Sequence, residues 1–240
     1  MNDTAQPDQK LSLFAAGMAA FLCVLWGANT VAIKFSLSGM GPFTSAAVRF
    51  GISAGFLWAW ARISGQSLRP AAGQLRPLLI NSLLFFVQLA LVYVGFTLTR
   101  ASRGALLTNL QPFFLLFMAH FFLSGDRVTA LKLIGLILGF TGGACVLLDR
   151  PDGGGQLVAG DLLLLVSTFF WACSAAYTKH LVRSSSSIQI VFYQLLFAVP
   201  LFALSAPVWD APMVSRIDVG IAAAMAFQVV LTTSFAFVAW

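Results

Sequence analysis

The chain has 240 residues, of which 59% are apolar and only 9% are charged, and its formal net charge is +6. Soluble domains carry roughly 25% charged residues, so the composition excludes an ordinary soluble protein. The basic residues are spread over the gaps between apolar runs, which indicates membrane topology and argues against a surface for nucleic acid.

Eight apolar runs follow one another, each long enough to cross a hydrocarbon core ~30 Å thick at ~1.5 Å per helical residue. We expect transmembrane helices at 12–33, 42–61, 78–97, 104–123, 129–148, 161–181, 187–206 and 218–240. The predicted fold class is therefore all-α, a polytopic membrane protein with eight transmembrane helices. No small-residue cleavage site follows a short apolar core, so the first helix is expected to remain as an anchor.

The basic residues also predict the orientation of the chain. With the N-terminus inside, eight Lys and Arg fall in inside segments, five fall at outside ends, and Arg49 lies within the second span. This modest excess agrees with the tendency of Lys and Arg to collect in cytoplasmic loops. We predict a multi-pass protein of the inner (plasma) membrane with a cytoplasmic N-terminus.

Arg49 is the most informative polar residue inside a predicted span. It lies seven residues after Pro42, or ~10 Å into the second helix. None of the eight Asp lies in the core of a span and the chain has no Glu, so no intramembrane carboxylate is expected to pair with it. Arg49 either grips an anionic solute, with Ser45 and Ser53 on the same face, or reaches the interface or the backbone carbonyls of a neighbouring helix.

Two tryptophans lie in mid-span, away from the interfacial belts where Trp usually collects. Trp26 shares a helical face with Asn29, and Trp171 shares one with Ser174. These faces can line a substrate pocket by stacking on a solute, or they can pack helices together.

Several small or amide side chains suggest contacts between helices. Asn109 lies in the fourth span, and Asn81 and Gln88 lie in the third. Amides in a membrane either line a cavity or hold helices together at ~0.6–2 kcal/mol per hydrogen bond. The spacing of Gly51 and Gly55 predicts close packing of the second span.

The sequence contains no catalytic set, phosphate loop or metal-ligand cluster. Its three Cys lie inside predicted spans without a His or carboxylate at ligand spacing. We therefore expect no enzyme activity, no catalytic residues, no metal and no cofactor.

A weak internal repeat relates the two parts of the chain. A shift of 145 residues superposes four pairs of polar or aromatic residues: Trp26 on Trp171, Asn29 on Ser174, Lys34 on Lys179, and Arg49 on Gln194. A repeat of five spans would enter the membrane from the opposite side in its second copy, as in secondary transporters with a midplane site. Chance agreement is the alternative, because only Trp and Lys are identical in the aligned stretch 17–34.

Three segments resemble the EamA-like family of the drug/metabolite transporter superfamily. Residues 26–50 read WGANTVAIKFSLSGMGPFTSAAVRF and are similar to the opening of an EamA-like repeat. Residues 99–148 are similar to its last two helices, with a mid-helix proline at Pro112, and residues 160–181 resemble the start of a second repeat. This resemblance implies ten helices in inverted repeats: a first five-helix repeat at 11–148, a linker at 149–159, and an incomplete second repeat of three helices at 160–240.

The resemblance also implies a transporter, expected to be an exporter, that moves small organic metabolites by alternating access. The residues expected to line its cavity and bind substrate are Trp26, Asn29, Arg49, Asn109, Trp171 and Gln194. The expected partners are a small-molecule metabolite and the lipid bilayer, without nucleic acid; a homodimer stays open. Two alternatives also stay open: a truncated fragment that does not transport, because counterparts of 104–148 are missing from the second repeat, or a membrane scaffold that assembles with another protein.

Overall fold

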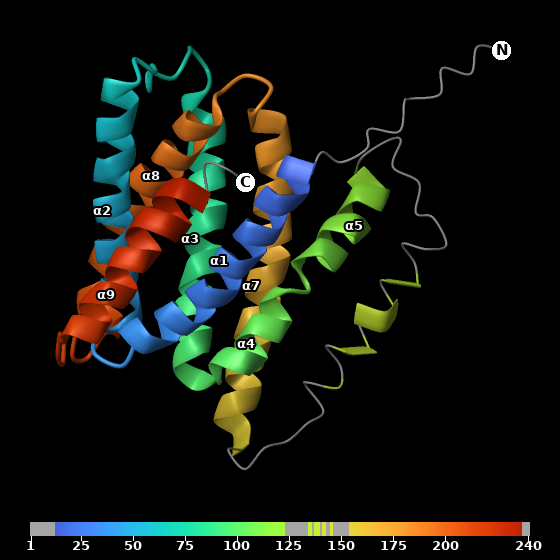
Figure 1. The fold of residues 1–240 in the computed structure, drawn as a ribbon, viewed down its shortest axis with the longest axis vertical. Helices are drawn as coiled ribbons and strands as arrows, with labels where there is room; N and C mark the ends of the chain where they lie inside the picture. The colour runs from blue at the N-terminus through green and yellow to red at the C-terminus, as the bar shows by residue number, and fades with distance from the viewer. Residues whose placement is uncertain are drawn as a thin grey trace.

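The computed structural model of the chain describes residues 13–122, 134–135, 137–139, 141–142, 145 and 154–236. In these ranges it is a helical bundle without strands, apart from one isolated bridge between Met40 and Val214. Its elements are α1 Leu13–Ser36, α2 Pro42–Ile63, α3 Leu75–Leu98, α4 Ala101–Thr108, α5 Gln111–Phe122, α7 Gly154–Leu181, α8 Ser187–Trp209, α9 Val219–Phe227 and the π-helix η1 Gln228–Ala236 (Figure 1). The predicted all-α class is confirmed.

Most of the predicted spans correspond to long helices. Five in the described part are long and apolar enough to cross a membrane: Ala16–Ser36, Leu75–Leu98, Val158–Leu181, Ser187–Trp209 and Val219–Ala236. α2 also has a spanning length of 22 residues, but Arg49, Arg62 and several hydroxyl side chains make it more polar. The chain is therefore a multi-pass membrane protein. The predicted fifth span, 129–148, lies mostly outside the described residues.

The fourth predicted span, 104–123, is not one continuous helix. α4 ends at Thr108 and α5 begins at Gln111. Pro112 has no N–H to donate, and its ring would clash with the carbonyl of Thr108 if a single helix continued through both residues. The chain turns at Asn109 and Leu110 instead, so this segment is two short helices.

Two other boundaries differ from the sequence prediction. α7 begins at Gly154, so the last six residues of the expected linker 149–159 are helical. The last described span changes from α-helix to π-helix at Gln228. The second change matters for the site, because η1 carries polar residues into the centre of the bundle.

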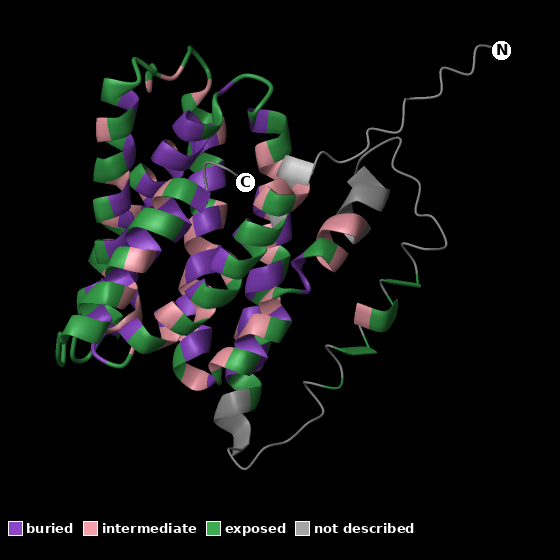
Figure 2. Ribbon diagram, in the orientation of Figure 1, coloured by how far each residue is buried: buried purple, intermediate pink, exposed green. Residues whose placement is uncertain are grey.

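Aromatic side chains fill the space between α2, α3 and α8. The ring centroid of Phe50 lies 5.5 Å from that of Phe85 and 5.8 Å from that of Phe202, and all three side chains are buried. Many large apolar side chains are exposed, among them Leu204 and Trp209. Exposed residues lie along the outside of the helices (Figure 2). In a bilayer these outer side chains face acyl chains, so an apolar exterior is consistent with membrane packing.

Helices from the two parts of the chain pack in pairs. α1 packs against α9 and η1, α7 packs against α3, and α2 packs against α8. At the α3–α7 crossing, a Cβ on Gly95 would lie 2.8 Å from the Leu164 side chain, and one on Gly160 would lie 3.0 Å from the Gly95 carbonyl oxygen. The close approach therefore uses Gly95 and Gly160. Around Gly51 and Gly55 no described atom lies nearer than 3.8 Å to an added Cβ, so their predicted role is wrong in the described part.

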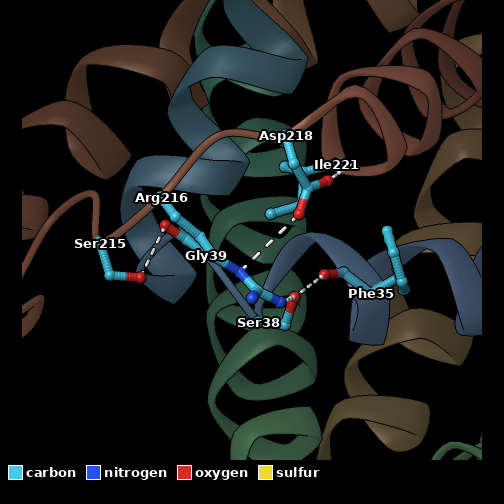
Figure 3. Close-up of polar contacts among 7 residues, drawn as sticks. All are labelled: Phe35, Ser38, Gly39, Ser215, Arg216, Asp218 and Ile221. Atoms are coloured by element: carbon cyan, nitrogen blue, oxygen red, sulfur yellow. Dashed lines mark hydrogen bonds and ion pairs between the residues drawn. The ribbon is translucent and has the colours of Figure 1, made fainter.

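The loops that follow α1 and α8 are bonded to each other. The Ser215 N–H donates to the Gly39 carbonyl at 2.9 Å, and the Gly41 N–H donates to the Met213 carbonyl at 2.9 Å. Figure 3 shows Ser215 and Arg216 beside Ser38 and Gly39. These bonds join the start of α2 to the connection between α8 and α9.

Asp210, the residue after α8, caps the N-terminus of α2. Its carboxylate accepts hydrogen bonds from the Thr44 N–H at 2.6 Å, the Thr44 hydroxyl at 2.7 Å and the Phe43 N–H at 3.3 Å. A Cβ on Gly41 would lie 2.4 Å from the Asp210 Cγ, so only glycine leaves room for this carboxylate. The cap satisfies otherwise unpaired N–H groups and places a negative charge at the positive end of the helix.

We expect Asp210→Ala to lower the free energy of unfolding by about 1–2 kcal/mol, because it removes a buried N-cap. The matched control is Asp218→Ala, since the exposed Asp218 caps its own helix through the Ile221 N–H and otherwise pairs with Arg216 of the same loop. Denaturant titration in detergent should show the larger loss for Asp210→Ala. Equal losses would contradict a special role for Asp210 in joining α8 to α2.

Candidate functional site

Arg49 is buried within α2, with 1% of its surface exposed. Its Nε donates to Thr233 Oγ1 at 2.7 Å and its Nη2 to Thr232 Oγ1 at 3.0 Å. Its Nη1 donates to Gln228 Oε1 at 3.1 Å and lies 3.4 Å from the Tyr93 hydroxyl. We call Arg49, Tyr93, Gln228, Thr232 and Thr233 the Arg49 cluster.

Neutral groups alone surround the cation of the Arg49 cluster in the described part of the chain. The carboxylates described there, those of Asp161, Asp210 and Asp218, bond to other groups. The Phe50 ring lies 5.1 Å from the Arg49 Cζ and adds a cation–π contact. Four contacts to side-chain oxygens hold the guanidinium. The alternative interpretation expected Arg49 to reach the interface or to cap backbone carbonyls, but within the described residues it is buried and bonds to side chains.

A second set of hydrogen bonds connects the Arg49 cluster to α1. The Gln228 Nε2 donates to the Ala32 carbonyl at 3.2 Å and to Ser36 Oγ at 3.3 Å. The Thr232 hydroxyl lies 3.1 Å from Asn29 Oδ1, and Asn29 is buried. Asn29 and Arg49, both predicted as site residues, are therefore joined through Thr232.

The π-helical form of η1 explains how its polar residues reach one side chain. In an α-helix, residues five apart are turned by ~140° from each other, since each residue advances ~100°. The wider i→i+5 turn of a π-helix brings residues four and five apart onto the same face. Gln228, Thr232 and Thr233 have this spacing, so η1 presents all three to Arg49.

The predicted polar stripe on α2 is present, and η1 covers it. Ser45 and Ser53 are fully buried on either side of Arg49. Ser45 Oγ lies 3.3 Å from Ser36 Oγ, and the Ser53 hydroxyl donates to the Val229 carbonyl at 3.4 Å. The stripe thus contacts α1 and η1 in this conformation.

Trp26 of α1 and Trp171 of α7 face each other. Their ring centroids are 5.6 Å apart with an interplanar angle of 53°. Both are half-buried, and Asn29 follows Trp26 by one turn on the same helix. The structure therefore brings together two tryptophans that the sequence places 145 positions apart.

The remaining predicted residues lie apart from the Arg49 cluster. Asn109 is exposed at the end of α4, where its Nδ2 donates to the Ala105 carbonyl at 2.8 Å. Gln194 is buried on α8, and no hydrogen bond joins it to the described residues of the cluster. Asn81 on α3 accepts from Ser174 at 3.2 Å.

The sequence analysis did not identify four members of the site. Three of them, Gln228, Thr232 and Thr233, belong to the only run of the last span that contains an amide and adjacent hydroxyl residues. That interruption of an apolar run was the available signal. Nothing in the sequence distinguished Tyr93, because an isolated Tyr in an apolar helix is common in packed interfaces.

Charged groups form a second cluster where α3 ends. The Arg103 Nε donates to Asp161 Oδ2 at 2.9 Å, and the Thr99 hydroxyl donates to Asp161 Oδ1 at 2.6 Å. Lys34 Nζ donates to the carbonyls of Phe96 and Thr99. These bonds tie α1, α3, α4 and α7 together at one end of the bundle.

Comparison with known proteins gives a family match. Residues 13–148, more than half of the chain, match the EamA-like transporter family. The uncharacterized transporter YyaM of Bacillus subtilis (strain 168) is 26% identical over 228 residues, which cover 90% of this chain and 73% of that protein. The probable amino-acid metabolite efflux pump of Escherichia coli (strain K12) is 26% identical over 193 residues, which cover 78% of this chain and 62% of the pump.

The fold also has a solved counterpart. A protein crystal structure superposes with a TM-score of 0.72 and covers 95% of this chain and 78% of its own. Its sequence identity is 20%, so the likeness concerns the fold alone.

We expect Thr233→Val to lower the free energy of unfolding by about 1–3 kcal/mol, because it leaves a buried guanidinium N–H without its acceptor. The matched control is Ser234→Ala at the next position, since the buried Ser234 Oγ has no partner in the described part. Denaturant titration should separate the two variants. A neutral Thr233→Val would mean that the Arg49 contacts contribute little to stability.

The Trp26–Trp171 contact predicts a favourable coupling of about 0.5–1.5 kcal/mol beyond surface burial. A double-mutant cycle of Trp26→Leu and Trp171→Leu, measured by the free energy of unfolding, tests it. Pairing Trp26→Leu with Trp58→Leu, on a different helix, is the control and should give additive losses. Additive losses for both pairs would exclude a direct ring contact.

Proposed function

The chain belongs to the EamA-like transporter family, and we propose that this membrane transporter exports a small organic metabolite that carries a carboxylate. The relative from Escherichia coli named as a probable amino-acid metabolite efflux pump supports both the outward direction and the substrate class. We assign the binding site to the Arg49 cluster with Asn29 and to the Trp26–Trp171 pair.

The observation on which this proposal rests is that, among the described residues, the buried Arg49 guanidinium has only neutral hydrogen-bond acceptors. A carboxylate binds a guanidinium more strongly than a hydroxyl or amide oxygen does, because it accepts two parallel charge-assisted hydrogen bonds. A substrate carboxylate can therefore replace the oxygens of Thr232 and Thr233 on Arg49. In the absence of substrate these neutral groups keep the guanidinium satisfied, so the site can alternate between two sets of acceptors.

The tryptophan pair supplies the apolar side of the proposed site. Trp26 lies one turn from Asn29, which reaches Arg49 through Thr232. An apolar or aromatic side chain of the substrate would stack on Trp26 and Trp171 while its carboxylate meets Arg49. A site with a cation on one side and aromatic rings on the other suits an amino-acid-derived metabolite, which has both a carboxylate and a side chain.

Access to Arg49 requires η1 to move from α2. α1 packs on α9 and η1, α7 packs on α3, and α2 packs on α8. This pattern is expected for two inverted repeats, because the pseudo-twofold axis that relates them maps each half onto the other. It supports our proposal that 11–148 and 160–240 are inverted repeats joined by 149–159, and that they expose the site alternately. Asn109 and Gln194 enter this proposal as residues in the wall of the opened cavity.

The ends of the bundle differ in charge, which supports a cytoplasmic N-terminus in the inner membrane. The carboxylates of the described part, Asp161, Asp210 and Asp218, lie with the end of α3 and the start of α2. The opposite end carries five exposed cations, Arg62, Arg69, Arg76, Lys179 and Arg183. The carboxylate end carries four cations, Lys34, Arg100, Arg103 and Arg216. Lys and Arg favour the cytoplasmic side, and this excess supports our proposal that the loops 64–74 and 182–186 are cytoplasmic.

We expect Arg49→Gln to reduce transport of a carboxylate-bearing amino-acid metabolite by about 10- to 150-fold, the loss expected for hydrogen bonds to a charged group at ~1.5–3 kcal/mol. Arg49→Lys should retain part of the activity, because it keeps the charge without the planar fork. The measurement is flux of labelled substrates in proteoliposomes, comparing each acid with its amide.

Arg216→Gln is the control for flux, since this exposed cation lies in the loop after α8. It should preserve both flux and the preference for the acid. The assignment of Arg49 would be wrong if Arg49→Gln retained the preference for acid over amide. Equal loss of acid and amide flux would likewise assign Arg49 to structure and not to substrate.

A further inference from the structure

A pocket of about 330 Å³ lies at the end of α2, away from the Arg49 cluster. Trp58 and Arg62 of α2, Arg69 within the loop 66–70, and Tyr193 of α8 contribute to its wall. Arg62 follows Arg49 by thirteen residues, a separation of ~20 Å along the helix. The pocket is therefore distinct from the proposed transport site and lies at the depth of the membrane interface.

The pocket is cationic, and described carboxylates are remote from it. Arg62 and Arg69 line it, whereas Asp210 caps the opposite end of α2, a helix ~33 Å long. Asp161 pairs with Arg103 at the C-terminal end of α3, whereas the loop 64–74 leads into the N-terminal end of the same helix. Asp161 and the pocket are therefore at opposite ends of α3. Within the described residues, an anion is the missing partner that fits this end.

The surrounding contacts hold the pocket in shape. The Arg62 Cζ lies 5.5 Å from the Trp58 ring centroid, so the guanidinium stacks on an aromatic face. The Gln189 Nε2 donates to the Arg69 carbonyl at 2.9 Å, and the Arg69 N–H donates to Ser67 Oγ at 3.3 Å. Both arginines are thus placed by neighbours from α2, the loop and α8.

An apolar strip leads from the pocket along the outside of α8. It begins at Tyr193 in the pocket wall and continues through the exposed residues Leu196, Pro200 and Leu204, of which Leu196 is 42% and Leu204 73% exposed. Their intervals of three or four residues place them on one helical face. A cationic pocket at the end of an exposed apolar strip matches the two parts of a phospholipid, a charged headgroup and an acyl chain.

We propose that this pocket binds the phosphate of an anionic membrane phospholipid through Arg62 and Arg69. The acyl chain lies along the apolar strip of α8, and Trp58 contacts the headgroup region. Bound lipid bridges α2, the loop 64–74 and α8, and so stabilises this end of the bundle. The recognised chemistry is a phosphate ester, which a lipid headgroup or a soluble phosphate ester can supply.

The experiment titrates the purified full-length chain in detergent with short-chain phosphatidylglycerol or the matched phosphatidylcholine. Native mass spectrometry counts bound lipid, and the shift in melting temperature reports stabilisation. We expect tighter binding of phosphatidylglycerol, with about fivefold weakening for each of Arg62→Gln and Arg69→Gln, the effect of one basic residue at an anionic surface. Arg62→Lys should retain most of the affinity.

Arg76→Gln is the control, because Arg76 is an exposed cation at the same end but outside the pocket wall. Its affinity for phosphatidylglycerol should stay near that of the unmodified chain. Soluble glycerol phosphate forms a separate arm: competition would assign the site to free phosphate esters as well, and its failure would assign the site to membrane lipid. Equal binding of both lipids, or equal effects of Arg76→Gln and Arg62→Gln, would overturn the proposal.

Discussion

The burial of one guanidinium organises the centre of this protein. A charged side chain inside a membrane costs several kcal/mol of free energy, so the N–H donors of Arg49 need hydrogen-bond acceptors from the protein itself. Those acceptors come from η1 and α3, and a further layer from Asn29 and Ser36 of α1 satisfies the acceptors in turn. Three separate stretches of sequence are thereby held around one side chain. The π-helical turn of η1 belongs to the same constraint, because it lets that helix present Gln228, Thr232 and Thr233 together.

Polar contacts at the ends of the helices decide how the two parts of the chain meet. Apolar side chains alone give little selectivity between neighbours in lipid, since the surrounding acyl chains are equally apolar. Asp210 on α2 and the Asp161–Arg103 pair supply directional contacts between α8 and α2 and between α7 and α4. Gly95 and Gly160 then allow α3 and α7 to approach closely. Together these features explain why helices distant in sequence become partners.

The two proposed anion sites place similar chemistry in different surroundings. Arg49 is enclosed by neutral oxygens, whereas Arg62 and Arg69 lie at an exposed interface. A buried cation with exchangeable acceptors suits a solute that must leave again. An exposed pair beside an apolar strip suits a lipid that stays. The proposed roles differ because desolvation strengthens each contact at the first site and water weakens it at the second.

Hydropathy and run length determined the all-α membrane fold and most of its helices, because a bilayer requires ~20 apolar residues per span. The same reasoning isolated Arg49, Trp26 and Trp171, since a charge or a mid-span Trp is conspicuous in an apolar run. It overlooked the break at Asn109, although Pro112 carried the signal. The partners of Arg49 on η1 are 179 to 184 positions away in the chain, and only the tertiary structure decided which helix would lie beside α2. Which helices become neighbours depends on glycine contacts, on caps at helix ends and on the π-helix η1. These features act between helices and therefore leave no periodic pattern in the sequence of either helix alone.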